Sequence, residues 1–312
     1  MATLRELTHR EDRLEGGHRL CAGCGASIAV RQILLGAGEE ALVAGCATGC
    51  LEVSTTIYPY SSWKVPFIHN AFENSAATIS GVEAAFKGLK AAGKIPADKK
   101  VKFVAFGGDG GTYDIGLQSL SGAMERGHDM VYVCYDNGAY MNTGIQRSSA
   151  TPRGAWATTA EVGKAQQGKR QKRKDLTSIM AAHGIPYVAQ GSISHWKDLT
   201  MKAEKAFAVE GPAFLNVLAT CPRGWRSAYN KSVETAKLGV QTGYWPLFEV
   251  EGGVWRQTVK VRERKPVEEF LKVQGRFKHL FVPENADLLA QIQTDVDEYW
   301  DYIQKRCACE GE

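Results

Sequence analysis

The stretch GGDGG, residues 107–111, decides the fold of this chain, because it follows the apolar run 101–106 without a break. A second polar stretch, DNGAYMN at 136–142, follows the apolar run 130–135 in the same way. Each apolar run predicts a buried strand, and residues 112–127 predict a helical crossover between the two strands. These segments therefore predict one right-handed βαβ unit, with two neighbouring parallel strands whose carboxyl ends meet at one edge of a sheet.

The residues at this edge have the chemistry of a diphosphate and metal site. Open α/β sheets bind ligands at the carboxyl ends of their strands. Glycines let backbone N–H groups approach a diphosphate, and a hard cation such as Mg²⁺ prefers a carboxylate together with neutral oxygens. Asp109 supplies the carboxylate, while the Asn137 side-chain oxygen and the Ala139 carbonyl complete the set. A lone GDG more often forms a plain β-turn, but the second polar cluster favours the ligand site.

The composition is that of a compact enzyme component. With 312 residues and 44% apolar content, the chain can bury a sizeable core, as one large α/β domain or as two closely packed halves. Its net charge of +4 is too small to indicate nucleic-acid binding, and no run approaches the length of a membrane span. The first twenty residues carry charges of both signs and lack the apolar core of a secretory signal. We therefore expect a cytoplasmic protein.

Cysteines from separate segments point to the same edge of the sheet. Eight cysteines in a chain expected in a reducing compartment are more often buried or bound to metal than paired in disulfides. Cys21 and Cys24 form a C-x2-C pair ahead of a predicted helix over 26–35, whose amide end favours thiolates. Cys50 and Cys221 each follow an apolar run. Four such thiolates could hold an iron–sulfur cluster, and by spacing alone they could equally hold structural zinc.

The other cysteines have simpler interpretations. Cys46 is the main rival of Cys50 as the third ligand, because it lies four residues earlier in the strand-to-turn region. Cys134 lies inside an apolar strand and is interpreted as a small buried hydrophobic residue. Cys307 and Cys309 form a C-x-C pair in a polar tail, for which an incidental surface pair is a simpler interpretation than a metal site.

Five segments resemble the 2-oxoacid:ferredoxin oxidoreductase family, and most closely the beta subunit of its pyruvate-oxidising branch. They are CAGCG at 21–25, CATGCLEVSTTIYPYSSWKVPFIHNAFEN at 46–74, GDGGTYDIG at 108–116, DNGAYMNTGIQRSSATPRGA at 136–155 and CPRGW at 221–225. They are spread over most of the chain and occur in the family's order. The resemblance implies an α/β fold that binds thiamine diphosphate, with a mostly parallel sheet and helices on both faces.

The resemblance also implies cofactors and the residues that hold them. The cofactors are thiamine diphosphate, Mg²⁺ and one [4Fe-4S] cluster. Cys50 is preferred to Cys46 because the ATGC ending matches the family's ligand segment. Asn142 resembles an asparagine that reaches the reacting centre, although a turn residue bonded to the local backbone is the alternative. The remaining implied residues are Cys21, Cys24 and Cys221 for the cluster, Asp109, Asn137 and Ala139 for Mg²⁺, and Gly108, Gly110 and Gly111 for the diphosphate turn. Some relatives have threonine in place of Asn137, which also presents a neutral oxygen.

The implied reaction is the oxidative decarboxylation of a 2-oxoacid, and it requires other chains. Only one diphosphate module is present, so the family implies an alpha subunit that completes the thiamine site. The chain lacks the repeated cysteine pattern of a two-cluster ferredoxin, which implies gamma and delta subunits with further [4Fe-4S] clusters and ferredoxin or flavodoxin as acceptor. Whether coenzyme A takes part stays open.

The substrate and the reaction class have alternatives. Pyruvate is the first choice, because the motifs are most similar to that branch. Oxalate is the alternative, for which Arg147 and Arg153 could supply positive charge. A different class of enzyme, a non-redox thiamine-dependent decarboxylase with structural zinc, would use the same cysteines.

The basic run in the long connection 147–174 is interpreted as a solvated loop. Docking of a partner subunit or of an acidic ferredoxin is the alternative. Nucleic-acid binding is disfavoured because no recognition motif accompanies the run. The basic residues are Lys164, Lys169, Arg170, Lys172, Arg173 and Lys174.

The chain is divided into two parts at about residue 240. Residues 1–240 are predicted to form the cofactor domain, and residues 241–312 a C-terminal helical extension with a helix over 286–305. Within the first part, His69 and Glu73 would form a proton-transfer pair if their segment were helical. A hydrogen-bonded core histidine is the simpler interpretation.

Overall fold

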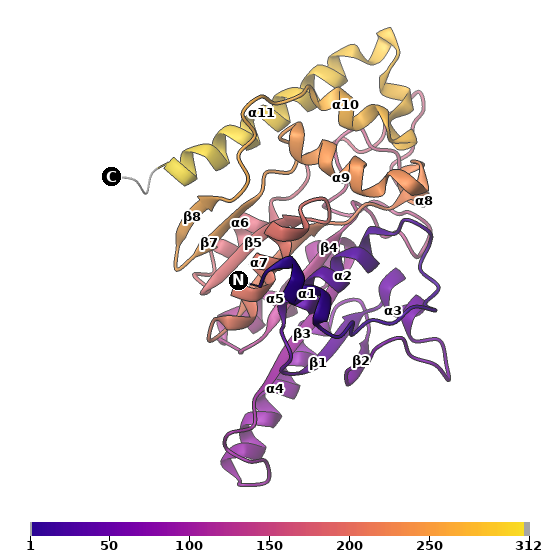
Figure 1. The fold of residues 1–312 in the computed structure, drawn as a ribbon. Helices are drawn as coiled ribbons and strands as arrows, with labels where there is room; N and C mark the ends of the chain where they lie inside the picture. Colours follow the sequence, from indigo (N-terminus) through magenta and orange to yellow (C-terminus); the bar gives the residue numbers. More distant parts are fainter. Residues whose placement is uncertain (1, 309–312) are drawn as a thin grey trace.

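A single eight-stranded sheet forms the centre of the molecule (Figure 1), in a computed structural model that describes residues 2–308. The strand order is β2-β1-β3-β4-β6-β5-β7-β8. The first six strands in sequence pair in parallel, and β7 and β8 add an antiparallel edge. The expected mostly parallel α/β sheet is therefore confirmed.

The strands are short and separated mainly by helices. The strands are β1 (Ala41–Ala47), β2 (Phe67–Asn70), β3 (Val101–Gly108), β4 (Val131–Asp136), β5 (Tyr187–Ser192), β6 (Ala213–Leu218), β7 (Phe248–Glu251) and β8 (Val254–Gln257). The α-helices are α1 (Leu4–His9), α2 (Gly25–Gly36), α3 (Cys50–Thr55), α4 (Ser75–Ala91), α5 (Leu117–Glu125), α6 (Leu176–Ala181), α7 (Trp196–Ala208), α8 (Pro222–Trp225), α9 (Ser232–Gln241), α10 (Val267–Lys272) and α11 (Ala286–Ala308). A π-helix, η1 (Gly110–Ile115), and the 3-10 helices η2 (Tyr229–Lys231), η3 (Gly275–Leu280) and η4 (Pro283–Asn285) complete the set.

The predicted βαβ unit is present, with one change in its crossover. β3 and β4 are parallel neighbours, and Gly108 lies opposite Tyr135 in their register. The helix expected over 112–127 is divided into η1 and α5. A π-turn of this kind is often found at functional sites. The glycine-rich stretch thus ends a strand and begins a widened helical turn at the carboxyl edge of the sheet.

Helices cover both faces of the sheet, because its central strands are apolar on both sides. In β4, Val131 and Val133 belong to one core, with side chains of α2 and α7. Tyr132 and Cys134 alternate with them and belong to the opposite core, with side chains of α4, α5 and α6. A strand buried on both faces reads as a continuous apolar run, and each buried large side chain stabilises the fold by roughly 1.5–3 kcal/mol.

The C-terminal segment contains more than the predicted helix. α11 confirms that helix, and its stripe of Ile292, Val296, Trp300 and Ile303 is buried against the rest of the chain. The short strands β7 and β8 join the main sheet through β5, which the polar pattern after residue 240 did not predict. Trp255 of β8 stacks on Phe248 of β7 with ring centroids 5.3 Å apart.

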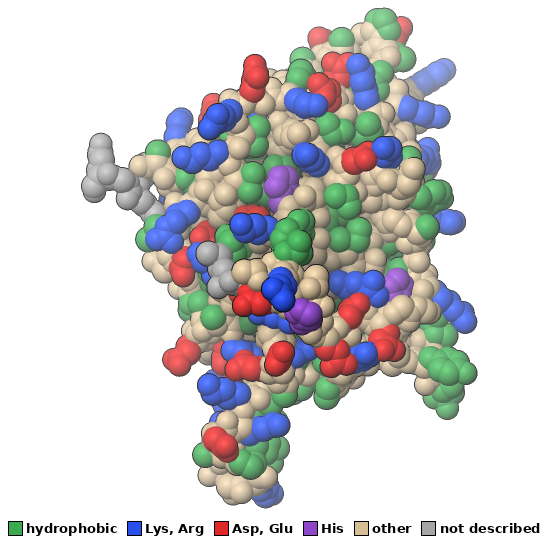
Figure 2. Space-filling view, in the orientation of Figure 1, with side chains coloured by type: hydrophobic (Ala, Val, Ile, Leu, Met, Phe, Trp, Pro, Cys, Tyr) green, Lys and Arg blue, Asp and Glu red, His purple; other side chains and the backbone are tan. Residues whose placement is uncertain are grey.

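Charges of both signs are interspersed over the face of the molecule that Figure 2 shows. Within residues 2–308, no helix is both long enough and apolar enough to span a bilayer.

Candidate functional site

A cleft opens at the carboxyl ends of β1, β3 and β4, where the sequence predicted the cofactor. Residues that the sequence singled out lie together there: Gly108, Gly110, Gly111, Asn137, Ala139, Asn142 and Cys50. Thr48, Gly49, Phe72, Tyr135, Tyr140, Met141 and Thr143 complete the lining. The sheet edge therefore collects residues of four separate segments into one site.

Oxygen ligands converge beside this cleft. Asp109 is 0% exposed, and its Oδ1 accepts a hydrogen bond from the Asn137 backbone N–H at 3.2 Å. The tip of the Asn137 side chain lies 2.9 Å from Asp109 Oδ1 and 2.9 Å from Ala139 O. In one orientation of the amide, its nitrogen donates to both of these oxygens. In the other orientation, the Asn137 side-chain oxygen lies beside Asp109 Oδ1 and Ala139 O, and a cation would be needed to bind the three oxygens together. This donor set of one carboxylate and two neutral oxygens fits Mg²⁺.

The electrostatics of Asp109 agree with that fit. Burial, followed by the negative charge of Asp136, raises the pKa of the Asp109 carboxyl to about 8. Hydrogen bonds from Ser148 Oγ and the Asn137 N–H act in the opposite direction. A divalent cation beside this carboxylate would favour its charged form, since opposite charge offsets the cost of burial.

The glycines of the turn have a packing reason as well as a binding one. A Cβ atom at Gly110 would lie 2.4 Å from the Tyr140 ring, and one at Gly111 would lie 2.9 Å from Phe72 O. Phe72 and Tyr140 themselves contact edge to face, with ring centroids 5.9 Å apart. Aromatic residues therefore pack so closely over the turn that side chains at these positions would collide with them.

The four cysteines of the predicted cluster all lie at or just ahead of helix N-termini. Cys24 is the N-cap residue of α2, Cys50 is the first residue of α3, and Cys221 is the N-cap residue of α8, where its Sγ accepts from Gly224 N at 3.3 Å. Cys21 is exposed and lies three residues ahead of Cys24. Helix N-termini stabilise thiolates and the negative charge of a cluster.

Electrostatic coupling shows that these four thiols are neighbours. Burial, followed by the charges of Cys221, Cys24 and Cys21, raises the pKa of the Cys50 thiol to about 12. The pKa of Cys221 is raised to about 11, first by burial, and Cys24 and Cys21 contribute. Thiols that perturb one another in this way form one group. Within residues 2–308, no three His, Cys, Asp or Glu side chains are close enough to hold a single metal ion.

Comparison with known proteins places this site in a family. Residues 44–217 match the C-terminal TPP-binding domain of thiamine pyrophosphate enzymes. Pyruvate synthase subunit PorB of Thermotoga maritima is 56% identical over 96% of this chain and 93% of its own length. PorB of Methanocaldococcus jannaschii is 51% identical over 97% of each chain. This chain belongs to the 2-oxoacid:ferredoxin oxidoreductase family. Another member, ketoisovalerate oxidoreductase subunit VorB of Pyrococcus horikoshii, is 45% identical over 95% of this chain and 93% of its own.

A solved structure shares the fold of this family member. The 2-oxoglutarate:ferredoxin oxidoreductase of Magnetococcus marinus, solved with 2-oxoglutarate, coenzyme A and succinyl-CoA bound, aligns with a TM-score of 0.54. At 22% identity, over 72% of this chain and 78% of that one, the likeness concerns the fold alone.

The other described cysteines, Cys46, Cys134 and Cys307, have different surroundings from the four-cysteine group. Cys46 is buried in β1, and burial followed by the charge of Glu52 raises its pKa, with no contribution from another cysteine. This environment favours Cys50 over Cys46 as the third cluster ligand. Cys134 is buried in β4, as predicted. Cys307 is half-buried near the end of α11, and Cys309 lies outside the described residues.

The solvated-loop interpretation of the basic run is wrong for two of its residues. Lys169 is only 4% exposed, and its Nζ donates to Ser149 O at 3.0 Å and to Thr151 O at 2.7 Å. Arg173 forms an ion pair with Asp136 at 2.6 Å. Both side chains point inward because they bind acceptors inside the protein. The pattern of charges in the sequence does not reveal these acceptors.

Two further expectations also need correction. The segment of His69 is strand β2 instead of a helix, and His69 Nδ1 pairs with Glu52 Oε1 at 2.9 Å. The hypothesis of a helical His69–Glu73 pair is therefore wrong. The alternative of a core histidine is wrong too, because the His69 side chain is 57% exposed. Arg153, a candidate for binding a dianionic substrate, instead pairs with Asp295 at 2.6 Å.

Sequence reasoning missed the residues that hold Asp136 and Asp109 in place. Asp136 Oδ1 accepts from Gly138 N at 3.1 Å, and its Oδ2 accepts from Tyr113 Oη and from Arg173, both at 2.6 Å. Ser148 donates to Asp109. Asp136 could have been found from its place beside Asn137, whereas Tyr113, Ser148 and Arg173 become neighbours only when the chain folds.

Proposed function

We propose that this chain is the beta subunit of a pyruvate:ferredoxin oxidoreductase of the pyruvate synthase type. One observation carries the proposal: the oxygen ligands at Asp109 and the four-cysteine group meet at the same edge of the sheet, in a chain of this family. Cys50 lies at the meeting point, because it belongs to the cysteine group and also lines the cleft. A cofactor and a cluster held here would be adjacent, as electron transfer requires.

The residues of the cleft would bind thiamine diphosphate through Mg²⁺. Asp109, the Asn137 side-chain oxygen and the Ala139 carbonyl would hold the cation, and the backbone N–H groups that follow Gly108 would face the diphosphate. Bound thiamine diphosphate supplies a nucleophilic carbon for the keto group of a 2-oxoacid and a ring that accepts the electron pair left behind when CO2 departs. Asn142 lines the cleft and is exposed toward its opening, so its amide is available to the reacting groups.

The cysteine group would hold one [4Fe-4S] cluster. Cys21, Cys24, Cys50 and Cys221 would each bind one iron, which suits thiols that come from separate segments. Their raised pKa values mean that iron binding must displace protons from Cys50 and Cys221. The helix N-termini at Cys24, Cys50 and Cys221 favour the thiolates that result.

Other chains would complete the enzyme. The relatives are named as subunits, which supports an alpha subunit over the open side of the cleft. Gamma and delta subunits with further clusters, and a ferredoxin or flavodoxin acceptor, follow from the single cluster that this chain can hold. The Magnetococcus marinus enzyme was solved with coenzyme A, and we extend its use to this enzyme.

Pyruvate is preferred to oxalate as the substrate. Identity is 56% and 51% to two pyruvate synthase subunits. Oxalate carries two negative charges and would need extra cations. Arg147 and Arg153 were the two candidates to bind the second charge of oxalate. Arg153 already forms an ion pair with Asp295, so only Arg147 remains of the two.

The test is anaerobic purification of the complex, followed by metal, sulfide and thiamine analysis and EPR after addition of pyruvate and then of oxalate. Iron, sulfide and thiamine, with an EPR signal that depends on pyruvate, are the expected result. Zinc without iron and no signal with any 2-oxoacid would reject electron transfer. An EPR signal that appears with oxalate but not with pyruvate would identify oxalate as the substrate instead.

A matched pair of variants tests the cluster ligands. Cys50→Ala is expected to remove the iron, because it deletes a ligand, whereas Cys46→Ala is expected to retain it. Iron content per chain is the measurement. Loss of iron in Cys46→Ala with retention in Cys50→Ala would reverse the assignment.

A further inference from the structure

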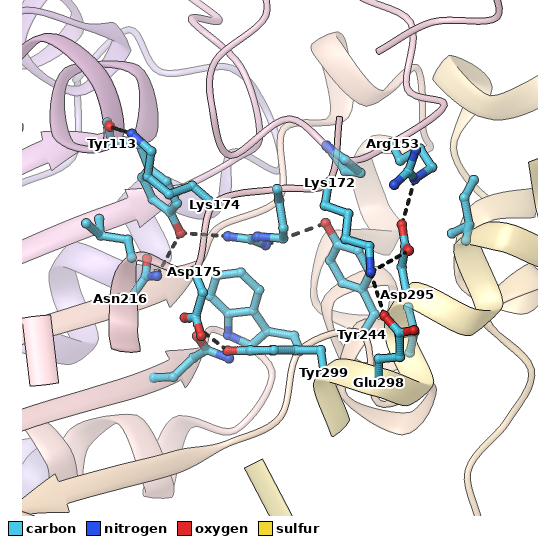
Figure 3. A pocket seen from close by; sticks show the side chains of 17 residues that line it. Tyr113, Arg153, Lys172, Lys174, Asp175, Asn216, Tyr244, Asp295, Glu298 and Tyr299 are labelled. Atoms are coloured by element: carbon cyan, nitrogen blue, oxygen red, sulfur yellow. Dashed lines mark hydrogen bonds and ion pairs between the residues drawn. The ribbon is translucent and has the colours of Figure 1, made fainter. Parts of the chain in front are cut away.

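A second cavity, of about 290 Å³, lies between the sheet and α11. It shares no lining residue with the cofactor cleft. Gln190 of β5 and Asn216 of β6 line it from the sheet, and Ile292 and Val296 line it from α11. Figure 3 shows Tyr113 and Asn216 across the cavity from Asp295 and Glu298. This volume is at the lower end for ligand sites and would suit a single ring system.

The walls are rich in aromatic rings. Tyr113, Tyr244, Trp245 and Tyr299 all line the cavity. The Arg173 guanidinium lies over the Trp245 ring, 4.5 Å from its centroid, and occupies one face of this ring. Aromatic faces and edges bind planar rings by offset stacking or edge-to-face contact. The cavity therefore favours a flat ligand over a flexible aliphatic one.

The cations around the cavity already have anionic partners, so an anionic ligand would have to displace them. The pairs are Arg173 with Asp136 at 2.6 Å, Arg153 with Asp295 at 2.6 Å, Lys172 with Asp295 at 3.0 Å and with Glu298, and Lys174 with Asp114 at 3.9 Å. Phosphate or carboxylate groups therefore find no free cation among the described lining residues.

Two hydrogen-bond acceptors in the cavity wall, in contrast, have capacity left for a ligand. In the part of the chain that the structure describes, Asp175 forms no ion pair. Its Oδ1 caps α6 by accepting from Ser178 N at 3.1 Å and faces Tyr299 Oη at 3.5 Å (Figure 3). Asn216 is 1% exposed, and its Oδ1 has no partner within residues 2–308. Its orientation is fixed, because Nδ2 donates to Tyr113 Oη and to Thr177 Oγ1.

We propose that this cavity binds a planar nitrogen heterocycle with an exocyclic amine, of the size of an aminopurine. The amine donates to the Asp175 carboxylate, and the ring packs among Tyr244, Trp245 and Tyr299. Three observations lead to this class of ligand: flat aromatic walls, cations that are already paired, and an acceptor without a cationic partner. The proposal is independent of the chemistry at the cofactor cleft.

The test is a fluorescence titration of the full-length protein with 2-aminopurine riboside, whose emission is quenched when its base stacks on aromatic rings. Saturable quenching is expected. Asp175→Asn is expected to weaken binding about tenfold or more, because a charged acceptor is lost. Asparagine caps helices as well as aspartate does, so α6 is retained, and an unchanged thermal unfolding curve verifies this.

Two matched comparisons complete the test. Glu298→Gln removes a carboxylate from the rim and is expected to leave the affinity within about twofold of the unaltered protein, since an exposed charge contributes little. Purine riboside, which lacks the amine, is expected to compete about tenfold more weakly than 2-aminopurine riboside. Quenching that does not saturate, or equal affinity in Asp175→Asn, would overturn the proposal.

Discussion

The ends of β3 and β4 each carry a buried aspartate, and the two differ in how their charge is balanced. Asp136 at the end of β4 has Arg173 at 2.6 Å and Tyr113 Oη at 2.6 Å. Asp109 at the end of β3 receives only neutral hydrogen bonds, from Ser148 Oγ and the Asn137 N–H. Burial and the neighbouring Asp136 raise the pKa of Asp109 to about 8.

This difference gives the two aspartates different roles: Asp136 supports the structure, and Asp109 is available to bind a cation. A buried carboxylate that already has a cationic partner fixes the structure around it, here the backbone N–H of Gly138. A buried carboxylate without such a partner is costly unless a ligand supplies the positive charge. Variants at Asp136, Asp109 and Ser148 test this division of roles, in order of decreasing expected effect.

Asp136→Asn is expected to destabilise the fold by about 3–5 kcal/mol, because it leaves the Arg173 guanidinium buried without its partner. Urea unfolding of the variant measures the change. Asp136→Asn combined with Arg173→Met should recover part of the loss, since no unpaired charge remains. Equal stability of the single and double variants would contradict the supporting role of Asp136.

Asp109→Asn is expected to weaken Mg²⁺-dependent thiamine diphosphate binding by about 100-fold, equivalent to about 2.7 kcal/mol. Calorimetric titration in the presence of Mg²⁺ measures it. Without Mg²⁺ the variant should be at least as stable as the unaltered protein, because a neutral amide replaces a buried carboxyl. A large loss of stability without Mg²⁺ would instead make Asp109 a structural residue like Asp136.

Ser148→Ala is expected to weaken Mg²⁺ binding about tenfold, because it removes a hydrogen bond to the charged form of Asp109. The same titration measures it. Ser149→Ala, at the adjacent position, is the control and should bind normally, since only the backbone of Ser149 contacts Lys169 and Asp114. Equal weakening in both variants would indicate a general disturbance of the loop.

Lys169 gives the unfolding free energy a defined pH dependence. Burial, followed by the charges of Arg147 and Arg173, lowers the pKa of Lys169 to about 8 in the folded protein, against 10.5 ordinarily. Between pH 8 and pH 10.5, Lys169 is therefore protonated in the unfolded chain but neutral in the folded protein. The stability that Lys169 contributes is present above pH 10.5 and is lost as the pH falls to 8.

The measurement is the free energy of unfolding of the unaltered protein and of Lys169→Met across that pH range. The unaltered protein is expected to gain on the order of 3 kcal/mol relative to the variant as pH rises, at about 1.4 kcal/mol for each unit of pKa difference. Parallel pH profiles would show that Lys169 is protonated equally in the folded and unfolded states.

The sequence predicted the strands and glycine turns around the site because these depend on adjacent residues. The apolar runs before Asp109 and Asn137, and the cysteine pair before α2, each carry their signal within a few positions. Strands β7 and β8 lacked such a signal, because each is four residues long and they follow a change to polar composition. The crossover helix was predicted as one element, although its first turn is a π-helix.

The parallel βαβ unit, the places of Asp109 and Asn137 at its edge and the family could all be read from the sequence, because each is encoded in short continuous motifs. Tertiary packing was needed to reveal that Arg173 pairs with Asp136 and that Lys169 turns inward. It also showed that, among residues 2–308, the Asp175 carboxylate beside the ring-lined cavity has no cationic partner. Such pairings join residues far apart in the chain, and their free energy depends on burial and distance, which exist only after the core has packed.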